Sequence, residues 1–524
     1  MKKIKNRFVY SILILSVLLT ACSDFLIQDP QTQLSNEQTF SNLDNMQAFL
    51  DGVYFKWKQT HVNRKAFFTM TDTDEIRMGE YQIRDNANQG AFDNYNSFYE
   101  NSDNPFTAEI WNVRWPVVVL SSQALDVLQN MEKTATGQDS ARVKSLIAQA
   151  SFYRAFVLFE LAMYWGEVPL TQVLGDEIKL TGRKPLNEVY AQIESDLKIV
   201  EAYSPDKPNA SNVRIPTTWA GKAMLAKVYM YAQEESGFRN YAKAKALLQE
   251  IKDRSGYRLL NNYADLWTGI DDTSAEVIYK LAFNNIYPDE NELQWYAGSR
   301  AVAQGGGGSN SYMAGYDLVL PTNYCREDID KGGIWEQGDV RKEESIRYSF
   351  VYNGTSCQAV SGFGNDQLEP HIKKFEDKRI DGVKEVYYTG KDFFILRYSD
   401  ILLLLAECLN EEGQTAAAVK IVNDEVRARA WGGVLPDEYK WNSGMSKDEF
   451  KTKILDERMR ELCFENWRRM DLLRTGNFVS YVNKHNPWAK ANGGPKDDHK
   501  RFPIPLVEIN QNEFISDTDQ NPGY

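Results

Sequence analysis

The sequence predicts a mainly α-helical protein, in which tetratricopeptide-like helix pairs form a repeat scaffold and a loop-rich subdomain is inserted between them. Three observations predict this fold: a clear helix pair at residues 398–430, further paired amphipathic helices before residue 265, and a loss of helical period between residues 256 and 394. Helix pairs of this kind cannot bury their apolar faces alone, so they must stack on one another.

The pair at residues 398–430 has the clearest pattern. Leu402, Ala406 and Leu409 recur at the i, i+4, i+7 spacing of one helix face, and Gly413 follows as a C-terminal signal. Ala418 in the second helix stands 12 residues after Ala406. This is the separation between the small residues at which two antiparallel helices of a tetratricopeptide-type pair cross closely.

Other helices and boundaries follow from the same periodicity. Helices are predicted, in order, at residues 42–57, 110–131 with a kink at Pro116, 140–165, 185–203, 219–231, 241–251 and 450–473. Residues 61–105 have no period but are rich in aromatics, and strands are predicted at residues 277–283 and 346–352. We divide the chain into a signal peptide (1–21), a tether (22–35), a scaffold (36–265) with a ligand loop (61–105), an inserted subdomain (266–395), a second scaffold segment (396–475) and an extended C-terminal segment (476–524).

The N-terminus has the pattern of a secretory signal peptide. Four basic residues, Lys2, Lys3, Lys5 and Arg7, precede an apolar run from Phe8 to Leu19, which is too short to span a bilayer. The following Leu19-Thr20-Ala21-Cys22 looks like a lipobox, in which the cysteine is acylated and becomes the first residue. We therefore expect a lipid anchor at Cys22.

Charge and cysteine content exclude several functions. With 60 Lys and Arg against 73 Asp and Glu, a net charge of -13 disfavours a nucleic-acid partner. The sequence has no CxxC and no Cys/His cluster, so we expect neither a metal nor a cofactor, although a structural calcium bound by loop carboxylates stays open. We expect Cys408 and Cys463 to be buried thiols, and pairing of Cys325 with Cys357 is left open.

The helix at residues 450–473 is dense in Arg and Glu. Opposite charges three or four residues apart on a helix pair with each other and with neighbouring helix ends more often than they catalyse. We therefore interpret them as structural.

Several motifs, in this order and spacing, resemble the SusD/RagB family. They are the lipobox with Cys22-Ser23-Asp24-Phe25-Leu26, the run Ser151-Phe152-Tyr153-Arg154-Ala155 leading to Tyr164-Trp165-Gly166-Glu167-Val168-Pro169-Leu170, the segment Leu396-Arg397-Tyr398-Ser399-Asp400, the helix Arg458–Arg474, and the closing Pro503-Ile504-Pro505 and Gln520–Tyr524. The resemblance implies a surface-exposed outer-membrane lipoprotein of a glycan-utilisation system. Such proteins cover a SusC-like, TonB-dependent transporter, bind oligosaccharides or in one branch peptides, and are not catalytic.

Position relative to the family's ligand loops places the site on two stretches. The candidate carbohydrate-binding residues are Asp74, Arg77, Tyr81, Arg84, Trp295, Tyr296, Tyr312 and Tyr316. Aromatic rings suit the C–H face of a sugar, and Asp and Arg suit its hydroxyls. We expect Trp295 and Tyr312 to be exposed stacking residues whose loss weakens binding without lowering the melting temperature. For each candidate the alternative is a purely structural role.

Two other functions compete with glycan binding. A helical glycoside hydrolase needs two carboxylates about 5 to 9.5 Å apart, and Asp72, Asp74 or Glu75 offers one of them without an identifiable second. A pure scaffold would use the repeats to bind protein only. A peptide ligand also stays open.

Overall fold

A computed structural model of the protein describes Phe40 and residues 42–84, 87–174, 177–209, 212–269, 273–383 and 387–524. The predicted signal peptide, Cys22 and the tether lie outside the described residues. The chain divides into two units, residues 1–49 and residues 50–524. In the first, the rings of Phe40 and Phe49 meet edge to face, with centroids 5.3 Å apart.

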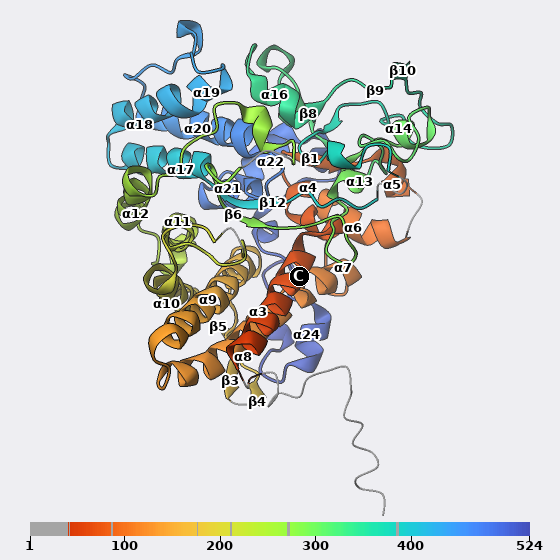
Figure 1. The fold of residues 1–524 in the computed structure, drawn as a ribbon. Coiled ribbons are helices and arrows are strands. Elements are labelled where there is room, and N and C mark those ends of the chain that lie inside the picture. Colours follow the sequence, from red (N-terminus) through yellow and green to blue (C-terminus); the bar gives the residue numbers. More distant parts are fainter. Residues whose placement is uncertain are drawn as a thin grey trace, which may run out of the picture. The chain divides into compact units, whose positions relative to one another are not determined.

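Long helices dominate the chain before the insert. They are α3 (Leu43–Lys58), α7 (Pro105–Asn112), α8 (Trp115–Glu132), α9 (Gly137–Trp165), α10 (Leu186–Tyr203), α11 (Thr218–Tyr231) and α12 (Tyr241–Arg254). From α8 to α12 each helix packs on the next, as Figure 1 shows. Helices α10 and α11 approach so closely that a Cβ on Gly221 would lie 2.9 Å from Cγ1 of Val200. The mainly helical fold predicted from the sequence is confirmed.

The repeat continues after the insert. Helix α17 (Tyr398–Glu411) packs directly on α12 and also contacts α18 (Thr415–Ile421) and α20 (Lys447–Leu462). Ala406 and Ala418 are both fully buried in this pair. A π-helical turn, Val422–Arg427, and the short α19 (Ala428–Ala430) extend the second helix. The chain between α12 and α17 is therefore an insert in a continuous helical stack.

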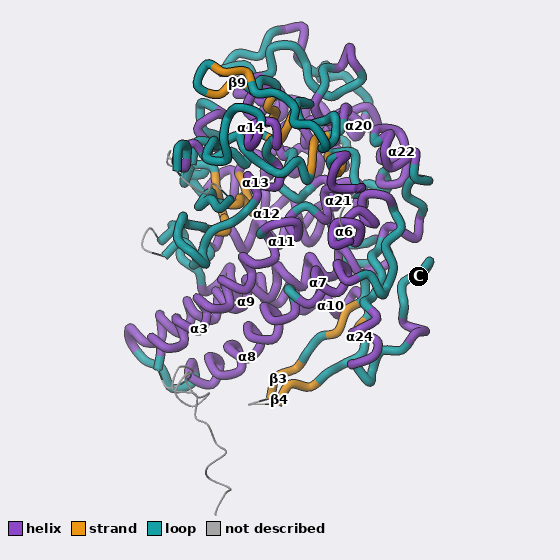
Figure 2. Tube along the Cα trace, turned by 90° about the vertical axis from the view of Figure 1, so that its right-hand side faces the viewer, coloured by secondary structure: helices purple, strands orange, loops and turns teal. Residues whose placement is uncertain are grey.

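Two strands pair near the start and the end of this insert. Strand β6 (Val277–Leu281) pairs antiparallel with β12 (Phe393–Arg397). Between them lie α13 (Leu293–Ala297), α14 (Arg300–Gln304), β7 (Val319–Pro321), α15 (Asn323–Arg326), α16 (Val340–Ser345), β8 (Ile346–Arg347), β9 (Val351–Tyr352), β10 (Thr355–Ser356) and β11 (His371–Ile372). The predicted strand at residues 346–352 is thus two separate short strands. In Figures 1 and 2, α13, α14 and β9 lie at the end of this unit opposite α8 and α9.

Residues 61–105 are more ordered than their lack of period indicates. They contain α4 (Phe68–Thr71), β1 (Ile76–Met78), α5 (Glu80–Arg84) and α6 (Ala87–Ser97), and β1 pairs antiparallel with β7 of the insert. Three of these elements, α4, β1 and α5, have only three to five residues and are too short for periodicity to reveal, whereas the longer α6 was missed. The ladder between β1 and β7 joins this segment to the insert.

Two helix boundaries differ from the prediction. Pro116 stands in the first turn of α8 and starts that helix rather than kinking a longer one. The predicted helix at residues 450–473 is two helices, α20 and α21 (Arg468–Arg474). Between them Phe464 and Asn466 have φ angles of 65° and 64°, which end α20.

The C-terminal segment winds back along the scaffold. It contains three helices, α22 (Phe478–His485), α23 (Pro487–Ala491) and α24 (Leu506–Gln511). Elsewhere, directly after α9, two short strand pairs form: β2 with β5 (Val168–Pro169, Arg183–Lys184) and β3 with β4 (Gln172–Leu174, Glu177–Lys179). Nδ2 of Asn521 donates hydrogen bonds to the carbonyls of Trp165 (2.9 Å) and Phe502 (2.7 Å). The last residues are thereby tied to the end of α9.

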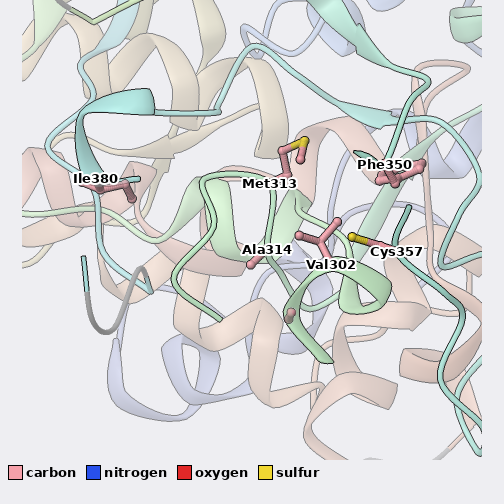
Figure 3. Packing of buried hydrophobic residues seen from close by; sticks show 7 residues of the cluster. Val302, Met313, Ala314, Phe350, Cys357 and Ile380 are labelled. Carbon is pink, nitrogen blue, oxygen red and sulfur yellow. The ribbon is translucent and has the colours of Figure 1, made fainter. Parts of the chain in front are cut away.

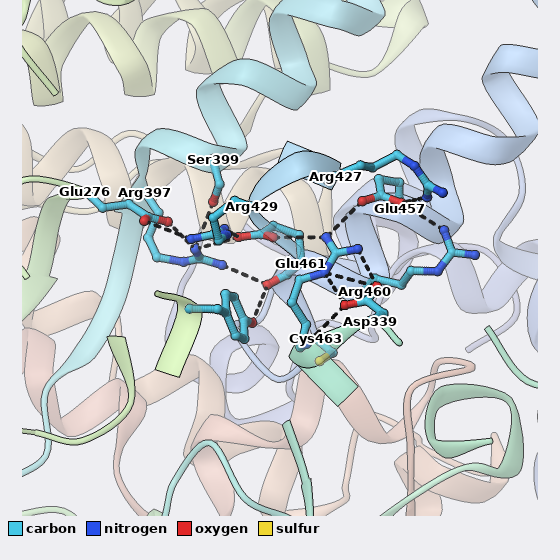
Figure 4. A network of polar contacts seen from close by, with 12 residues as sticks. Glu276, Asp339, Arg397, Ser399, Arg427, Arg429, Glu457, Arg460, Glu461 and Cys463 are labelled. Carbon is cyan, nitrogen blue, oxygen red and sulfur yellow. Dashed lines mark hydrogen bonds and ion pairs between the residues drawn. The ribbon is translucent and has the colours of Figure 1, made fainter. Parts of the chain in front are cut away.

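The charged side chains of α20 form a buried ion-pair network, as the sequence predicts (Figure 4). Glu461 lies 2.9 Å from Arg397, 2.6 Å from Arg429 and 3.1 Å from Arg341. Arg397 also pairs with Glu276 at 2.9 Å. Burial opposes ionisation of Glu461, but Arg429, Arg397 and Arg341 outweigh it and hold its pKa well below the usual range. The network fastens both ends of the insert to the scaffold.

Four cysteines lie in the described part of the chain, and all are buried free thiols. This confirms the prediction for Cys408 and Cys463, whereas Cys325 and Cys357 are not paired. Within the described ranges, no group of three or more His, Cys, Asp or Glu side chains is placed to hold a metal ion. Over the same residues only α9 has the length and apolar composition of a membrane-spanning helix, and its side chains are mostly buried in the protein.

Candidate functional site

Aromatic side chains from three segments gather around one arginine. The Arg300 guanidinium carbon lies 4.8 Å from the ring centre of Tyr81, 4.7 Å from that of Tyr316 and 4.3 Å from that of Phe363. The rings of Tyr296 and Tyr316 meet edge to face with centroids 6.3 Å apart. Tyr81, Tyr296, Tyr316 and Phe363 are all partly exposed, and we call them the aromatic surface.

Arg300 is fixed within this cluster. It is only 5% exposed, and its Nη2 donates to the carbonyl of Tyr316 at 3.1 Å. Its backbone N–H donates to Asp317 at 2.8 Å, and its Nε lies 3.6 Å from the same carboxylate, which also contacts Nε2 of His371 at 3.0 Å. A guanidinium held this way attracts the electron-rich faces of the surrounding rings.

Backbone contacts hold the rings in place. The N–H of Tyr316 donates to the carbonyl of Trp295 at 2.8 Å, and that of Leu318 donates to Tyr296 at 2.9 Å. Nε2 of Gln82 in α5 donates to the carbonyl of Tyr316 at 2.6 Å. The aromatic surface is therefore preorganised by α5, α13 and the turn before β7, which lowers the conformational cost of binding.

The chemistry of this surface suits a polyol with apolar faces. Partly exposed tyrosine rings offer flat apolar contact together with hydroxyl groups. Glu292 is hydrogen-bonded to Tyr296, and burial together with the Glu292 charge raises the pKa of Tyr296 above its ordinary value. A ligand here meets ring faces, phenol hydroxyls and one carboxylate.

Three of the eight predicted residues, Tyr81, Tyr296 and Tyr316, meet in this surface. Arg77 lies beside it: its guanidinium pairs with Asp366 at 3.0 Å and Glu369 at 3.2 Å, at the edge of a cavity of about 380 Å³. Arg84 is the last residue of α5, but its side chain lies outside the described residues.

Trp295 and Tyr312 lie elsewhere in the insert. Both are partly buried and pack against a small core (Figure 3), whose residues are Val302, Ala303, Met313, Ala314, Phe350, Cys357 and Ile380. The ring of Trp295 also meets that of Tyr387 edge to face, with centroids 4.3 Å apart. Trp295 and Tyr312 thus pack on this core while part of each side chain remains exposed, so their role in ligand binding stays a prediction.

The acidic candidates of the first stretch are buried. Asp74 is fully buried and forms a two-point ion pair with Arg468, and Asp72 lies 2.6 Å from Arg469. Glu75 is 1% exposed. A ligand in solvent does not reach Asp74, so its assignment to the site is replaced by a structural one.

Sequence reasoning missed Arg300 and Phe363. Arg300 begins α14, the helix after the one that carries Trp295 and Tyr296, and nothing in the sequence marks it as the centre of an aromatic cluster. Phe363 stands between Gly362 and Gly364, a spacing that indicates an exposed turn.

Two larger cavities lie away from the predicted residues. One, of about 490 Å³, is lined by α17, α20, α21 and the loop after α11, and another, of about 620 Å³, lies between α8 and α10. No candidate residue lines either of them.

The chain is similar to known proteins over its whole length. A model of the SusD family matches residues 298–524, and a second model, described as starch-binding associating with outer membrane, matches residues 24–230. SusD-like protein P2 of Formosa agariphila is 25% identical over 539 residues, covering 100% of both chains. The starch-binding protein SusD of Bacteroides thetaiotaomicron is 23% identical over 580 residues, covering 100% of this chain and 99% of its own.

Solved structures agree with this fold. A laminarin-binding SusD-like protein superimposes with a TM-score of 0.72 at 21% identity, covering 92% of this chain and 99% of its own. A SusD homologue from Bacteroides thetaiotaomicron superimposes with a TM-score of 0.77 at 17% identity, covering 94% and 99%. With matching models at both ends and full-length relatives between them, the chain belongs to the SusD/RagB family.

Proposed function

We propose that this protein binds a glycan on its aromatic surface, at the outside of the outer membrane, and delivers it to a SusC-like TonB-dependent transporter without cleaving it. The observation that carries this proposal is the gathering of Tyr81, Tyr296, Tyr316 and Phe363 around Arg300. Rigid, partly exposed rings are what the C–H face of a sugar needs.

The names of relatives support a glycan ligand. The relatives include a starch-binding protein and a laminarin-binding protein, which bind two different glucans. The laminarin-binding protein shares this fold, so the scaffold is compatible with glycan binding, and the ligand loops decide which glycan is bound.

The burial of the acidic residues supports a binding role without catalysis. A glycosidase needs a proton donor and a second carboxylate that both reach the sugar. Asp72 and Asp74 face Arg469 and Arg468 in the interior instead. Glu292 stands next to the aromatic surface, where it is hydrogen-bonded to Tyr296.

The export signal and Cys22 support the location. A lipid on Cys22 would hold the protein at the outer membrane, in keeping with the description of the family model that matches residues 24–230. Purification of the tagged protein from native membranes tests the anchor and the partner together. We expect a barrel transporter to co-purify with it, and we expect Cys22→Ala to release the protein from the membrane and abolish this co-purification.

Titration calorimetry against a panel of starch-derived and laminarin-derived glycans and peptides tests the ligand. We expect a glycan to bind, Tyr316→Ala to weaken that binding by about 1–3 kcal/mol, and Tyr316→Phe to retain most of it. Tyr203→Ala is the matched control, because Tyr203 is a partly exposed tyrosine of α10, at the other end of the unit. Binding of peptides but of no glycan, or release of sugar products, would contradict the proposal.

A further inference from the structure

A cavity of about 380 Å³ shares helix α5 and the segment 363–369 with the aromatic surface. Side chains from four segments far apart in the sequence line it, including Arg77, Glu80, Asn323, Arg326, Glu369 and Trp488. We call it the Trp488 pocket. Its volume lies within the range of small-ligand sites.

The fold fixes the walls of this pocket. The ladder between β1 and β7 sets Arg77 opposite Leu320, and Oγ1 of Thr322 donates to the carbonyl of Asp74 at 2.5 Å. On the opposite wall, Nδ2 of Asn486 donates to the carbonyl of Thr73 at 2.7 Å. The same asparagine caps α23, which carries Trp488. Strand and helix are therefore held by the same buried segment.

The charges of the pocket are balanced. Glu369 accepts from Arg326 at 2.6 Å and from Arg77 at 3.2 Å, and Arg77 also pairs with Asp366. Burial alone would raise the pKa of Glu369, but the hydrogen bonds and charges of Arg326 and Arg77 outweigh it and lower the pKa. Glu80 adds a second carboxylate to the lining. The two carboxylates would repel an anion, and the two guanidinium groups would repel a cation. The lining therefore favours a neutral ligand.

The polar groups match hydroxyls. Carboxylates accept from a sugar hydroxyl, whereas guanidinium and amide groups donate to it. Nε1 of Trp488 is buried and has no hydrogen-bond partner in the described part of the chain. The indole also supplies the flat apolar contact that a pyranose ring needs.

The pocket and the aromatic surface share two segments. In α5, Glu80 lines the pocket and Tyr81 belongs to the surface. In the segment 363–369, Phe363 belongs to the surface and Glu369 to the pocket. A single chain of linked sugars can therefore contact both.

We propose that the Trp488 pocket binds one neutral sugar residue of the glycan held on the aromatic surface, stacked on Trp488 and hydrogen-bonded to Arg77, Arg326 and their carboxylate partners. This inference rests on the proposed function. The ligand is then a neutral glycan that occupies both places, and a short oligosaccharide that fills only one binds more weakly.

Filling the pocket from its rim tests this inference without removing a buried contact. Ala491 lines the pocket and is exposed, so Ala491→Trp should block it and leave the melting temperature unchanged. Ala417→Trp, at an exposed alanine of α18, is the matched control. Titration calorimetry with starch-derived and laminarin-derived polysaccharides should show a loss of about tenfold or more for Ala491→Trp and for Trp488→Ala, and none for Ala417→Trp.

The outcomes separate the two proposals. If the wild type binds no glycan, the proposed function fails and the pocket assignment fails with it. If the wild type binds and Tyr316→Ala weakens binding while Ala491→Trp leaves it unchanged, only the pocket assignment is overturned. Tighter binding of sulfated or uronate-bearing glycans that depends on Trp488 would overturn the neutral ligand.

Discussion

Asp74 and Arg468 form a buried two-point ion pair: Oδ1 accepts from Nε at 2.8 Å, and Oδ2 accepts from Nη2 at 2.6 Å. The pair ties the segment before β1 to the start of α21. The strand that carries Arg77 is thereby fastened to the scaffold, so Asp74 supports the site without touching its ligand.

Replacement of Asp74 by Asn should therefore reduce stability and not affinity. Breaking a buried ion pair leaves the arginine uncompensated, and we expect a loss of about 3–5 kcal/mol in the free energy of unfolding. Urea denaturation measures it, with the exposed Asp437→Asn as control. If the Asp74→Asn protein is as stable as the wild type and binds glycan more weakly, Asp74 takes part in ligand binding and the structural assignment is wrong.

Trp295→Ala and Tyr312→Ala should behave differently from Tyr81→Ala. The first two side chains pack on the small core of the insert, so truncation should lower stability by about 1–3 kcal/mol. Tyr81→Ala should instead weaken glycan binding with a smaller effect on stability. Thermal denaturation and titration of the three variants side by side measure both quantities, and the reverse pattern would show that the ligand surface lies around Trp295.

Stability should fall between about pH 4.5 and pH 8 because of Glu75. Burial, with a contribution from Cys463, raises the pKa of Glu75 from 4.5 to about 8. As the pH rises through this window the unfolded state loses its proton first, so the folded state is progressively disfavoured. A difference of one between the two pKa values corresponds to about 1.4 kcal/mol.

Glu75→Gln has no such proton to lose. Denaturation at both ends of this window measures the free energy of unfolding of the variant and of the wild type. We expect the difference to shift in favour of the variant by at least about 1 kcal/mol at the higher pH. The exposed Glu449→Gln is the control. An equal difference at both pH values would mean that Glu75 ionises normally.

Glu461 should show the opposite pH dependence. Its folded pKa lies below the ordinary value because of Arg429, Arg397 and Arg341, so its stabilising effect is present above about pH 4.5 and is lost as the pH falls through the folded pKa. Glu461→Gln should cost about 3–5 kcal/mol at neutral pH. Urea titrations from neutral to acidic pH measure it, and a cost that does not shrink on acidification would contradict the assignment.

Much of the helical scaffold is predictable because its signal is local. Apolar residues at helical spacing and Gly413 mark α17 and its end within a few residues. The break between α20 and α21 is not predictable this way, because Phe464 lies in a left-handed conformation that its residue type does not favour.

The site was only partly predictable because long-range contacts assemble it. Tyr81 and Tyr316 carry an aromatic signal, but long-range contacts bring them together, among them the pairing of β1 with β7, which are separated by more than two hundred residues. Asp74 has the composition of a ligand residue, and only the fold places Arg468 against it. Trp488 lies in α23, far along the chain from both predicted stretches.

The most direct test of glycan binding on the aromatic surface is a crystal structure of the mature protein with a bound oligosaccharide. We expect an intact glycan with a sugar ring face against Tyr81 or Tyr316, within the reach of the cluster around Arg300. A glycan bound only in the cavity beside α17 and α20, or one that has been cleaved, would contradict the account.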